Sequence, residues 1–255
     1  MTEVMAGSNR LKNQLAAGVN VLGAFLLTAS SDNAEVLAQA GFDFLLIDHE
    51  HGCGSHGDAI AQMRAMQGTT TSSILRVPSL DPPYIKRVLD AGVQGILCPM
   101  IENAAAAETL RDACWYPPFG RRGAGGGTRA SRYGYDANAA DRVKKDVLIA
   151  VQIETAASIA HIPEIAAVEG VDLLVIGPRD LSASIGKLGR FNDPEVLGLV
   201  AQAEAAIIAS GKPLGSVVYP GRTAKDMFCS GYDLLIVGSD VSYLTDGARR
   251  ALAPS

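Results

Sequence analysis

Apolar residues gather along the chain into short continuous runs, and segments of helical composition separate them. A run that is apolar at successive positions, rather than at every second one, is typical of a parallel strand buried on both faces. The runs predict strands at residues 21–28, 42–48, 73–78, 95–101, 147–154, 171–177, 214–219 and 232–238. The intervening segments predict helices at 32–40, 57–66, 82–91, 104–113, 156–167, 194–210, 222–230 and 241–252.

Glycine follows several of the predicted helices just before the next strand, where it favours the conformation that ends a helix. These glycines are Gly41, Gly68, Gly92, Gly170, Gly211 and Gly231. Eight strand–helix units predict a single α/β domain over residues 1–255, a TIM (β/α)8 barrel. A doubly wound open sheet is the alternative, but no G-x-G-x-x-G motif follows the first strand.

Composition narrows the class of protein further. The 255-residue chain is 48% hydrophobic and carries a charge of −5, so it can bury a sizeable core and gives no reason to expect nucleic acid. Charged residues interrupt every apolar stretch, so no membrane association is expected. The N-terminus is a polar lead-in followed by a short helix rather than a signal peptide. Four cysteines without paired spacing, namely Cys53, Cys98, Cys114 and Cys229, fit the reduced thiols of a cytoplasmic protein.

Two acidic residues follow successive predicted strands. Glu154 ends the run 147–154, and Asp180 comes shortly after the run 171–177. Parallel pairing of these strands would bring both carboxylates to the same edge of the sheet. Two carboxylates at one edge suit a hard divalent cation such as Mg²⁺ or Mn²⁺. The alternative is that each acid caps the helix that follows it. The pair together favours a metal site.

His51 follows the second predicted strand, and its imidazole can act as a general base near neutral pH. A hydrogen-bonded loop histidine is the simpler alternative. A zinc site is a further alternative, because His49, Cys53 and His56 lie in the same loop. No cysteine pair accompanies these residues, so zinc is the weaker hypothesis.

Arg76 ends the third predicted strand, where a buried guanidinium needs a partner. It could bind a substrate carboxylate or a developing enolate, or it could form an ion pair with Asp48 or Glu50. No lysine lies in a predicted strand, which argues against an aldolase that forms a Schiff base inside the barrel. Carbanion chemistry here would depend on a metal.

The segment between Cys114 and Asp146 is longer than the usual connection in such folds. It carries a glycine run together with Arg121, Arg122, Arg129 and Arg132. It could form a lid over the active-site face or hold an anion on backbone N–H groups. A surface used for subunit packing is the alternative, and both are compatible.

Several stretches, taken in order, resemble the HpcH/HpaI aldolase family, the metal-dependent (class II) pyruvate aldolases. They are AGFDFLLIDHEHG at 40–52, LRVPSLDPPYIKRVLDAGVQGILCPM at 75–100, YPPFGRRGAGGGTRASRYG at 116–134, VQIET at 151–155 and VEGVDLLVIGPRDLSASIG at 168–186. The resemblance covers nearly the whole chain. It implies a TIM barrel that cleaves or forms 4-hydroxy-2-oxo acids, with pyruvate or hydroxypyruvate as the nucleophilic half and an aldehyde as the other.

The resemblance also implies roles for individual residues. Glu154 and Asp180 would bind Mg²⁺, Mn²⁺ or Co²⁺, Arg76 would stabilise the enolate, and His51 would be the base. Asp90 would raise the basicity of His51, and Asp48 would sit beside the site. Pyruvate would be held by Gln152, Gly177, Pro178, Arg179 and Asp180. The family commonly has a small residue or Asn at the position of Arg179.

Two other functions remain as alternatives at this point. A related carbon–carbon lyase could act on an acyl-CoA, but no separate C-terminal region is available to cover the CoA. A non-catalytic metabolite-binding barrel is the other, and the combination of His51, Arg76, Glu154 and Asp180 argues against it. The resemblance further implies a homohexamer assembled through terminal helices, with small-molecule substrates as the other partners.

Overall fold

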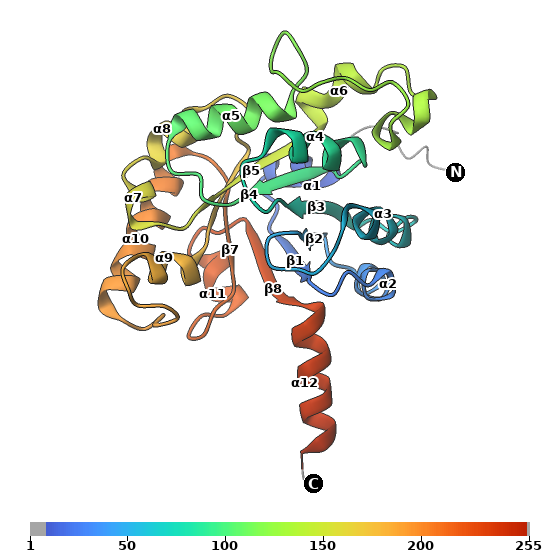
Figure 1. The fold of residues 1–255 in the computed structure, drawn as a ribbon. Helices are drawn as coiled ribbons and strands as arrows, with labels where there is room; N and C mark the ends of the chain where they lie inside the picture. The colour runs from blue at the N-terminus through green and yellow to red at the C-terminus, as the bar shows by residue number, and fades with distance from the viewer. Residues whose placement is uncertain (1–8, 254–255) are drawn as a thin grey trace.

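The computed structural model describes residues 9–253, and its strands form a closed parallel barrel in the order of the sequence (Figure 1). The strands are β1 (Val21–Leu26), β2 (Phe44–Asp48), β3 (Ser72–Arg76), β4 (Gly95–Cys98), β5 (Leu148–Ile153), β6 (Leu173–Ile176), β7 (Leu214–Val217) and β8 (Leu234–Ser239). β8 pairs with β1 and closes the ring. The predicted TIM barrel is therefore confirmed, and the open-sheet alternative is wrong.

Helices follow the strands and surround the barrel. They are α1 (Arg10–Ala16), α2 (Ser31–Gln39), α3 (His56–Ala65), α4 (Pro82–Asp90), α5 (Ala104–Cys114), α6 (Ala139–Asp146), α7 (Ala156–Ile159), α8 (Ile162–Ala167), α9 (Pro178–Ser184), α10 (Pro194–Ser210), α11 (Ala224–Cys229) and α12 (Asp240–Leu252), with a 3₁₀ segment η1 (Arg129–Gly134). The predicted helix 156–167 is two helices, because Pro163 has no N–H and its ring would clash with the preceding turn. The sequence pattern did not predict α6, η1 or α9.

The interior of the barrel changes character along each strand. Side chains alternate between the two faces of a strand, so every second residue points inward. Leu148 and Ala150 of β5 belong to the inner apolar cluster, which Leu11 and Leu15 of α1 also join. Further along β5 the same inward face carries Gln152. The barrel thus has an apolar floor at the N-terminal ends of its strands and a polar mouth at their C-terminal ends.

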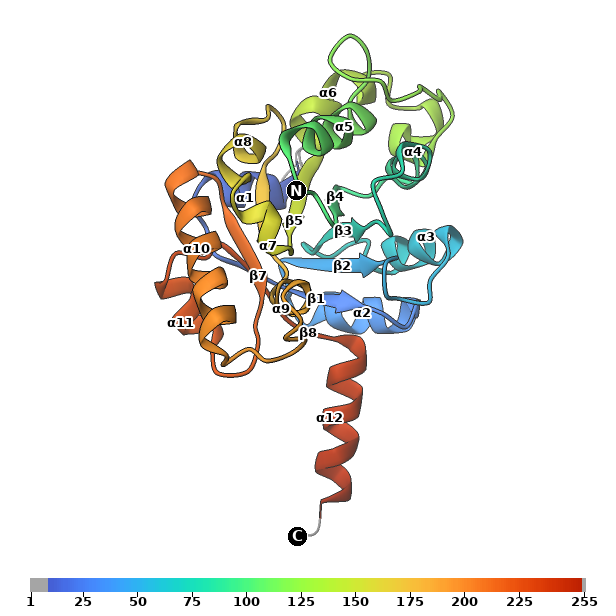
Figure 2. The same ribbon diagram turned by 60° about the vertical axis from the view of Figure 1, so that its left-hand side comes forward.

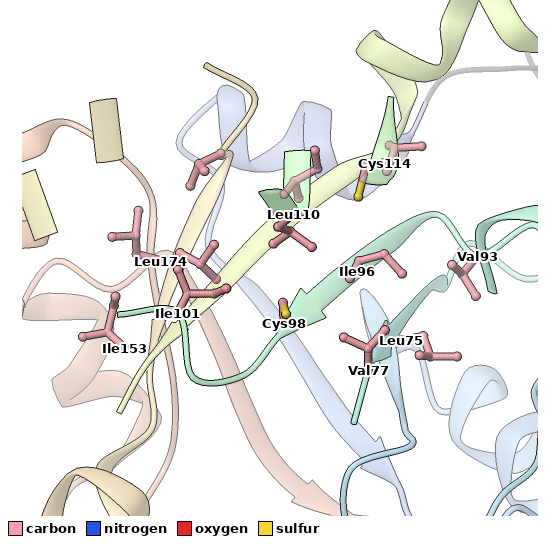
Figure 3. Packing of buried hydrophobic residues seen from close by; sticks show 14 of the residues in the cluster. Leu75, Val77, Val93, Ile96, Cys98, Ile101, Leu110, Cys114, Ile153 and Leu174 are labelled. Carbon is pink, nitrogen blue, oxygen red and sulfur yellow. The ribbon is translucent and has the colours of Figure 1, made fainter. Parts of the chain in front are cut away.

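The outward faces of the strands form a second apolar layer with the surrounding helices. Figure 3 shows this layer where Ile96 and Cys98 of β4 lie under Leu110 and Cys114 of α5. All four of these side chains are completely buried. The two layers together hold the strands in place, so the residues at the mouth rest on a rigid framework.

Gly23 shows how tightly the floor is packed. A Cβ on this residue would lie 2.4 Å from the ring of Phe44, which fills the inside of the barrel. We therefore expect Gly23→Ala to destabilise the fold by about 1–3 kcal/mol, the usual cost of overpacking a core. Gly198→Ala is the matched control, because nothing lies within 4 Å of a Cβ there. It should be neutral or stabilising by up to about 1 kcal/mol, since Gly198 lies inside a helix. Urea unfolding of both variants measures the difference, and equal midpoints would contradict the packing argument.

The long segment 115–146 follows α5 and leads into β5, which places it at the N-terminal end of the barrel. It borders a cavity of about 870 Å³ together with Gln94 and Val147, the residues just before β4 and β5. Within the segment, the Arg129 guanidinium donates to the Ala91 carbonyl at the end of α4, 2.9 Å away. The hypothesis of a lid over the chain's own mouth is wrong, because a helix-to-strand connection returns to the end opposite the mouth.

The last helix, α12, points away from the barrel instead of packing along it (Figures 1 and 2). The N-terminal part of α12 is held against the barrel by Tyr243, whose ring stacks on the Phe42 ring with the centroids 6.1 Å apart. Beyond that point Leu244 is 59% exposed and Leu252 is 84% exposed. Among residues 9–253, no helix is both long and apolar enough to cross a membrane.

Candidate active site

Glu154 lies just after β5 at the mouth and is only 2% exposed. Burial raises the pKa of its carboxyl to about 7, although a hydrogen bond from the Met100 backbone opposes the shift. The charges of Glu50 and Asp180 raise the pKa further. Charge effects of this kind require short separations. Asp180 lies in the first turn after β6, the strand that pairs with β5, so both carboxylates belong to the C-terminal ends of neighbouring strands.

Three parts of the chain fix the orientation of the Glu154 carboxylate. Its Oε1 accepts a hydrogen bond of 2.6 Å from the Met100 backbone N–H, and its Oε2 accepts one from the Gln152 amide. Met100 has a φ of 54°, which is uncommon for a residue other than glycine. Gly177 leaves the necessary room, because a Cβ there would lie 2.8 Å from Gln152 Nε2 and 2.9 Å from Glu154 Oε2.

Asp180 lies in the first turn of α9 and is partly exposed. Its carboxylate has no hydrogen bond or ion pair with any residue that the structure describes. Thr155 caps α7 by accepting from Ser158 N–H, and Gly177 occupies the cap position of α9. Neither Glu154 nor Asp180 therefore caps a helix with its side chain, although Asp180 keeps the favourable first-turn position that the alternative considered.

Arg76 ends β3 inside the mouth and is almost completely buried. Its Nε and Nη2 donate to the two oxygens of Asp48 at 3.0 and 2.6 Å, and its Nη1 lies 2.9 Å from Glu50 Oε2. The ion pair considered from the sequence is thus present, with both candidate partners. A guanidinium has five N–H donors, so the two bonds to Asp48 leave donors on Nη1 and Nη2 for a ligand.

His51 lies in the loop after β2, and its side chain is 63% exposed. Its nearest charged neighbour is Glu50, with 3.9 Å between His51 Nε2 and Glu50 Oε2. Glu50 therefore stands between Arg76 and His51. Burial raises the pKa of Glu50, although the charge of Arg76 opposes this.

Three of the four side chains proposed for a zinc site face separate neighbours, and the fourth, His56, has no hydrogen-bond partner for its Nδ1 among the residues described. His49 Nδ1 lies 2.6 Å from the Tyr84 hydroxyl, and Cys53 Sγ faces the Leu27 carbonyl at 3.5 Å. His51 points towards Glu50 instead. Nothing in this arrangement favours zinc.

Asp90 is the last residue of α4, on the outside of the barrel. It accepts a 2.6 Å hydrogen bond from Arg122 of the long segment, and Arg122 in turn lies over the Tyr116 ring. No hydrogen bond or ion pair joins Asp90 to His51 within residues 9–253. The contact implied by the family resemblance is therefore not made inside one chain.

Sequence reasoning missed Glu50 and Met100 as parts of the site. Glu50 was considered only as a partner of Arg76, although the spacing of Asp48, Glu50 and His51 in one loop already placed it there. Met100 acts through its backbone N–H, and no residue pattern signals a left-handed conformation at a methionine.

The donor set at the mouth fits a divalent cation. Glu154 is buried and oriented, Asp180 is unpartnered among the described residues, and the charges of Glu50 and Asp180 together disfavour ionisation of Glu154. A cation would relieve this repulsion. Among residues 9–253, no three His, Cys, Asp or Glu side chains are arranged to hold a metal. Mg²⁺ commonly uses one or two carboxylates and completes its coordination with water and substrate oxygens.

A closed parallel barrel whose charged residues gather at the C-terminal ends of the strands is the architecture of TIM-barrel enzymes. Comparisons with known proteins define the family. Residues 22–246 match the model of the HpcH/HpaI aldolase/citrate lyase family. The 4-hydroxy-2-oxovalerate aldolase of Novosphingobium aromaticivorans is 41% identical, over 96% of this chain and 93% of its own length. The hydroxypyruvate/pyruvate aldolase of Agrobacterium fabrum is 38% identical, over 96% and 92%.

A solved structure agrees with these sequence matches. An HpcH/HpaI aldolase/citrate lyase family protein from Burkholderia cenocepacia superposes with a TM-score of 0.93 and 34% identity, covering 96% of this chain and 98% of the other. The chain belongs to the HpcH/HpaI aldolase/citrate lyase family.

Proposed function

We propose that this protein is a class II aldolase that reversibly cleaves 4-hydroxy-2-oxo acids into an aldehyde and pyruvate or hydroxypyruvate. The observation that carries the proposal is the mouth, where the Glu154–Asp180 carboxylate pair lies beside a buried arginine and an exposed histidine. The names of the relatives support the same reaction, since one cleaves a 4-hydroxy-2-oxo acid and another is a hydroxypyruvate/pyruvate aldolase.

Glu154 and Asp180 would hold the divalent cation, which could be Mg²⁺, Mn²⁺ or Co²⁺. When bound, the cation draws negative charge from the 2-oxo acid. Gln152, Gly177, Pro178 and the backbone at Arg179 and Asp180 would then surround the pyruvate half. The position of Gln152 and Gly177 beside Glu154 supports this proposal, since Gln152 donates to the Glu154 carboxylate and Gly177 leaves room for it.

His51 removes the proton from the 4-hydroxyl of the substrate, since it is the exposed base at the mouth. As the hydroxyl becomes a carbonyl, the C3–C4 bond breaks and its electron pair forms the enolate of pyruvate. The free donors of Arg76 stabilise that negative charge, and Asp48 holds the guanidinium in place. Protonation of the enolate at C3 gives pyruvate. In the synthetic direction His51 takes a methyl proton of pyruvate.

The family role of Asp90 stays a proposal that needs a second chain. Asp90 and His51 are not in contact within one chain, so a partner subunit would have to bring its own Asp90 to this mouth. The segment 115–146, to which Asp90 is tied by Arg122, would then lie at a subunit interface.

The reaction is tested by following pyruvate release from 4-hydroxy-2-oxo acids with and without Mg²⁺, Mn²⁺ or Co²⁺. Metal-dependent release supports the proposal. Borohydride trapping of the enzyme with pyruvate should fail, because no lysine lies in a strand of the barrel. Trapping, or full turnover in exhaustive chelator, would contradict it. A panel of aldehydes with pyruvate and hydroxypyruvate identifies the acceptor.

We expect metal affinity to depend on pH through Glu154. Its pKa of about 7 means that the metal-free carboxyl holds a proton below that pH, and the metal must displace it. Mn²⁺ affinity should therefore fall about tenfold per pH unit below about pH 7 and level off above it. The raised pKa also predicts that metal-free protein loses stability as the pH rises from about 4.5 to about 7, since the folded state binds the extra proton.

Titrations followed by Mn²⁺ electron paramagnetic resonance, without substrate, measure the affinity from pH 5.5 to 8.5. Melting temperatures over the same range measure the stability. The Glu154→Gln variant is the control, because it should lose the stability slope. A wild-type affinity that does not change below pH 7 would contradict the assignment of Glu154 as a ligand.

The exposed apolar side chains of α12 support a homo-oligomer, a hexamer by the family resemblance. Leu244 is 59% exposed and Leu252 is 84% exposed, so the residues that the structure describes leave much of both side chains uncovered. We expect Leu244→Asp to lower the mass measured by light scattering, whereas Arg249→Asp on the same helix should not. An unchanged mass for Leu244→Asp would argue against assembly through α12.

The four cysteines are all free, which fits the reducing cytoplasm that the sequence predicts.

A further inference from the structure

Asp240 is a buried carboxylate that the proposed reaction does not use. It is the first residue of α12, directly after β8, and only 2% exposed. Its Oδ1 accepts from Leu27 N–H at 2.9 Å, and its Oδ2 accepts from Thr28 N–H at 3.1 Å and from the Thr28 hydroxyl. Asn33 Nδ2 adds a weaker contact at 3.4 Å. Burial alone would raise the pKa of Asp240, but these hydrogen bonds outweigh it and leave the pKa below its ordinary value.

The residues that Asp240 binds form the exit from β1, and this exit touches the loop that carries His51. The Leu27 carbonyl accepts from Cys53 N–H at 3.2 Å and faces Cys53 Sγ at 3.5 Å. Gly52 lies between the end of β2 and the exit from β1, where there is no room for a side chain. A Cβ on Gly52 would lie 2.1 Å from the Asp48 carbonyl oxygen and 3.2 Å from the Leu27 carbonyl oxygen. The loop therefore rests directly on the β1 exit.

The other anchor of the loop is the Asp48 side chain. Its Oδ1 accepts from Glu50 N–H at 3.0 Å and from His51 N–H at 3.3 Å. The His51 ring itself makes no hydrogen bond to any residue that the structure describes, and its nearest charged atom is 3.9 Å away. The position of the imidazole is thus set by the backbone of its loop, and hence by Asp48 on one side and Leu27 on the other.

We propose that Asp240 is a positioning residue for His51. It holds Leu27 and Thr28 in place, and the Leu27 carbonyl holds the turn at Gly52 and Cys53 that presents the imidazole to the mouth. The proposal rests on the function proposed above, in which His51 is the base. A base displaced by about 1 Å loses much of its effect, by up to about 10²-fold.

Asp240→Asn tests the chain of contacts, because an amide cannot accept on both of its polar atoms. Thr28→Val removes the hydrogen bond that the Thr28 hydroxyl donates to Asp240 but keeps the bond from the Thr28 N–H. Thr28→Ser keeps the hydroxyl and should behave like the wild type. Ser242→Ala is the matched control. It breaks the capping box of the same helix, in which Ser242 Oγ accepts from Ser239 N–H at 2.8 Å, but leaves every bond of Asp240 to the β1 exit.

The first measurement is hydrogen–deuterium exchange of the peptide that spans residues 50–54, with β3 as the internal reference. Asp240→Asn and Thr28→Val should speed exchange of this peptide about tenfold or more without changing β3, and Ser242→Ala should not. The second measurement compares aldol cleavage with oxaloacetate decarboxylation, which has no 4-hydroxyl proton to remove. Cleavage should fall about tenfold or more in Asp240→Asn, while decarboxylation and the KM for pyruvate stay within about twofold.

Unchanged exchange at residues 50–54 in both folded variants would overturn the inference, and so would equal losses of cleavage and decarboxylation. The His51→Ala variant distinguishes failure of this inference from failure of the proposed function. If His51→Ala keeps full cleavage, His51 is not the base, and a change of exchange in Asp240→Asn would then report only a structural link.

Discussion

Glu154→Gln is expected to abolish aldol cleavage, by about 10³-fold or more, while the barrel stays folded. The charge stabilisation that a metal contributes is worth several kcal/mol, and each 1.4 kcal/mol is a factor of ten in rate. Glutamine keeps the shape and the contact with Met100 N–H but removes the anionic ligand. Because burial already disfavours the charge of Glu154, the metal-free variant should melt at the same temperature as wild type or higher.

The measurement is pyruvate release together with Mn²⁺ binding in the same preparation. Asp180→Asn should behave similarly, since Asp180 is the second proposed ligand. Glu102→Gln is the control at the rim of the mouth, where Glu102 is exposed and its Oε1 accepts a 3.3 Å hydrogen bond from the Thr155 hydroxyl. A Glu154→Gln enzyme that binds Mn²⁺ normally would show that the metal lies elsewhere.

The second large effect separates the base from the group that stabilises charge. His51→Ala should lose cleavage by roughly 10²–10⁴-fold, the usual contribution of a positioned base. Its decarboxylation of oxaloacetate should fall much less. Arg76 variants should lose both reactions, because both pass through the enolate of pyruvate and Arg76 cannot lose its charge.

The structure decides which arginine variant is informative. Arg76→Ala would leave Asp48 and Glu50 without their common partner, and breaking a buried pair costs about 3–5 kcal/mol. Arg76→Lys keeps the charge and loses the two-pronged bond to Asp48, so it should keep the fold and still lose both activities. Melting curves confirm that each variant is folded. An Arg76→Lys enzyme that decarboxylates normally, or a His51→Ala enzyme whose two activities fall in parallel, would contradict this division of roles.

The barrel and most of its strand ends could be predicted because buried parallel strands have a strong local pattern. The position of Glu154 at the end of an apolar run was enough to place it at the mouth. The partners of Arg76 could be narrowed to Asp48 and Glu50, but the sequence could not show that it binds both. That outcome depends on side-chain packing across β2 and β3, which leaves no trace in a local pattern.

The segment 115–146 could not be placed because its glycines and arginines fit a lid and a packing surface equally well. The structure shows that the segment connects the end of α5 to the start of β5. It therefore lies at the N-terminal end of the barrel, opposite the mouth. Asp240 was not noticed for a related reason. It follows an ordinary strand, and its importance lies in contacts with residues more than 200 positions earlier in the chain.

The exposed position of Arg179 bears on how an enzyme of this kind could change its aldehyde acceptor. It is exposed and lies beside a proposed metal ligand, and its guanidinium has no hydrogen bond or ion pair with any of the residues described. The apolar floor that stabilises the fold lies at the other end of the barrel. We therefore expect substitutions at position 179 to cost little folding free energy, and we propose that they alter the preference among aldehydes. Evolution, or a saturation library, is free to explore charge and size at this position independently of the core.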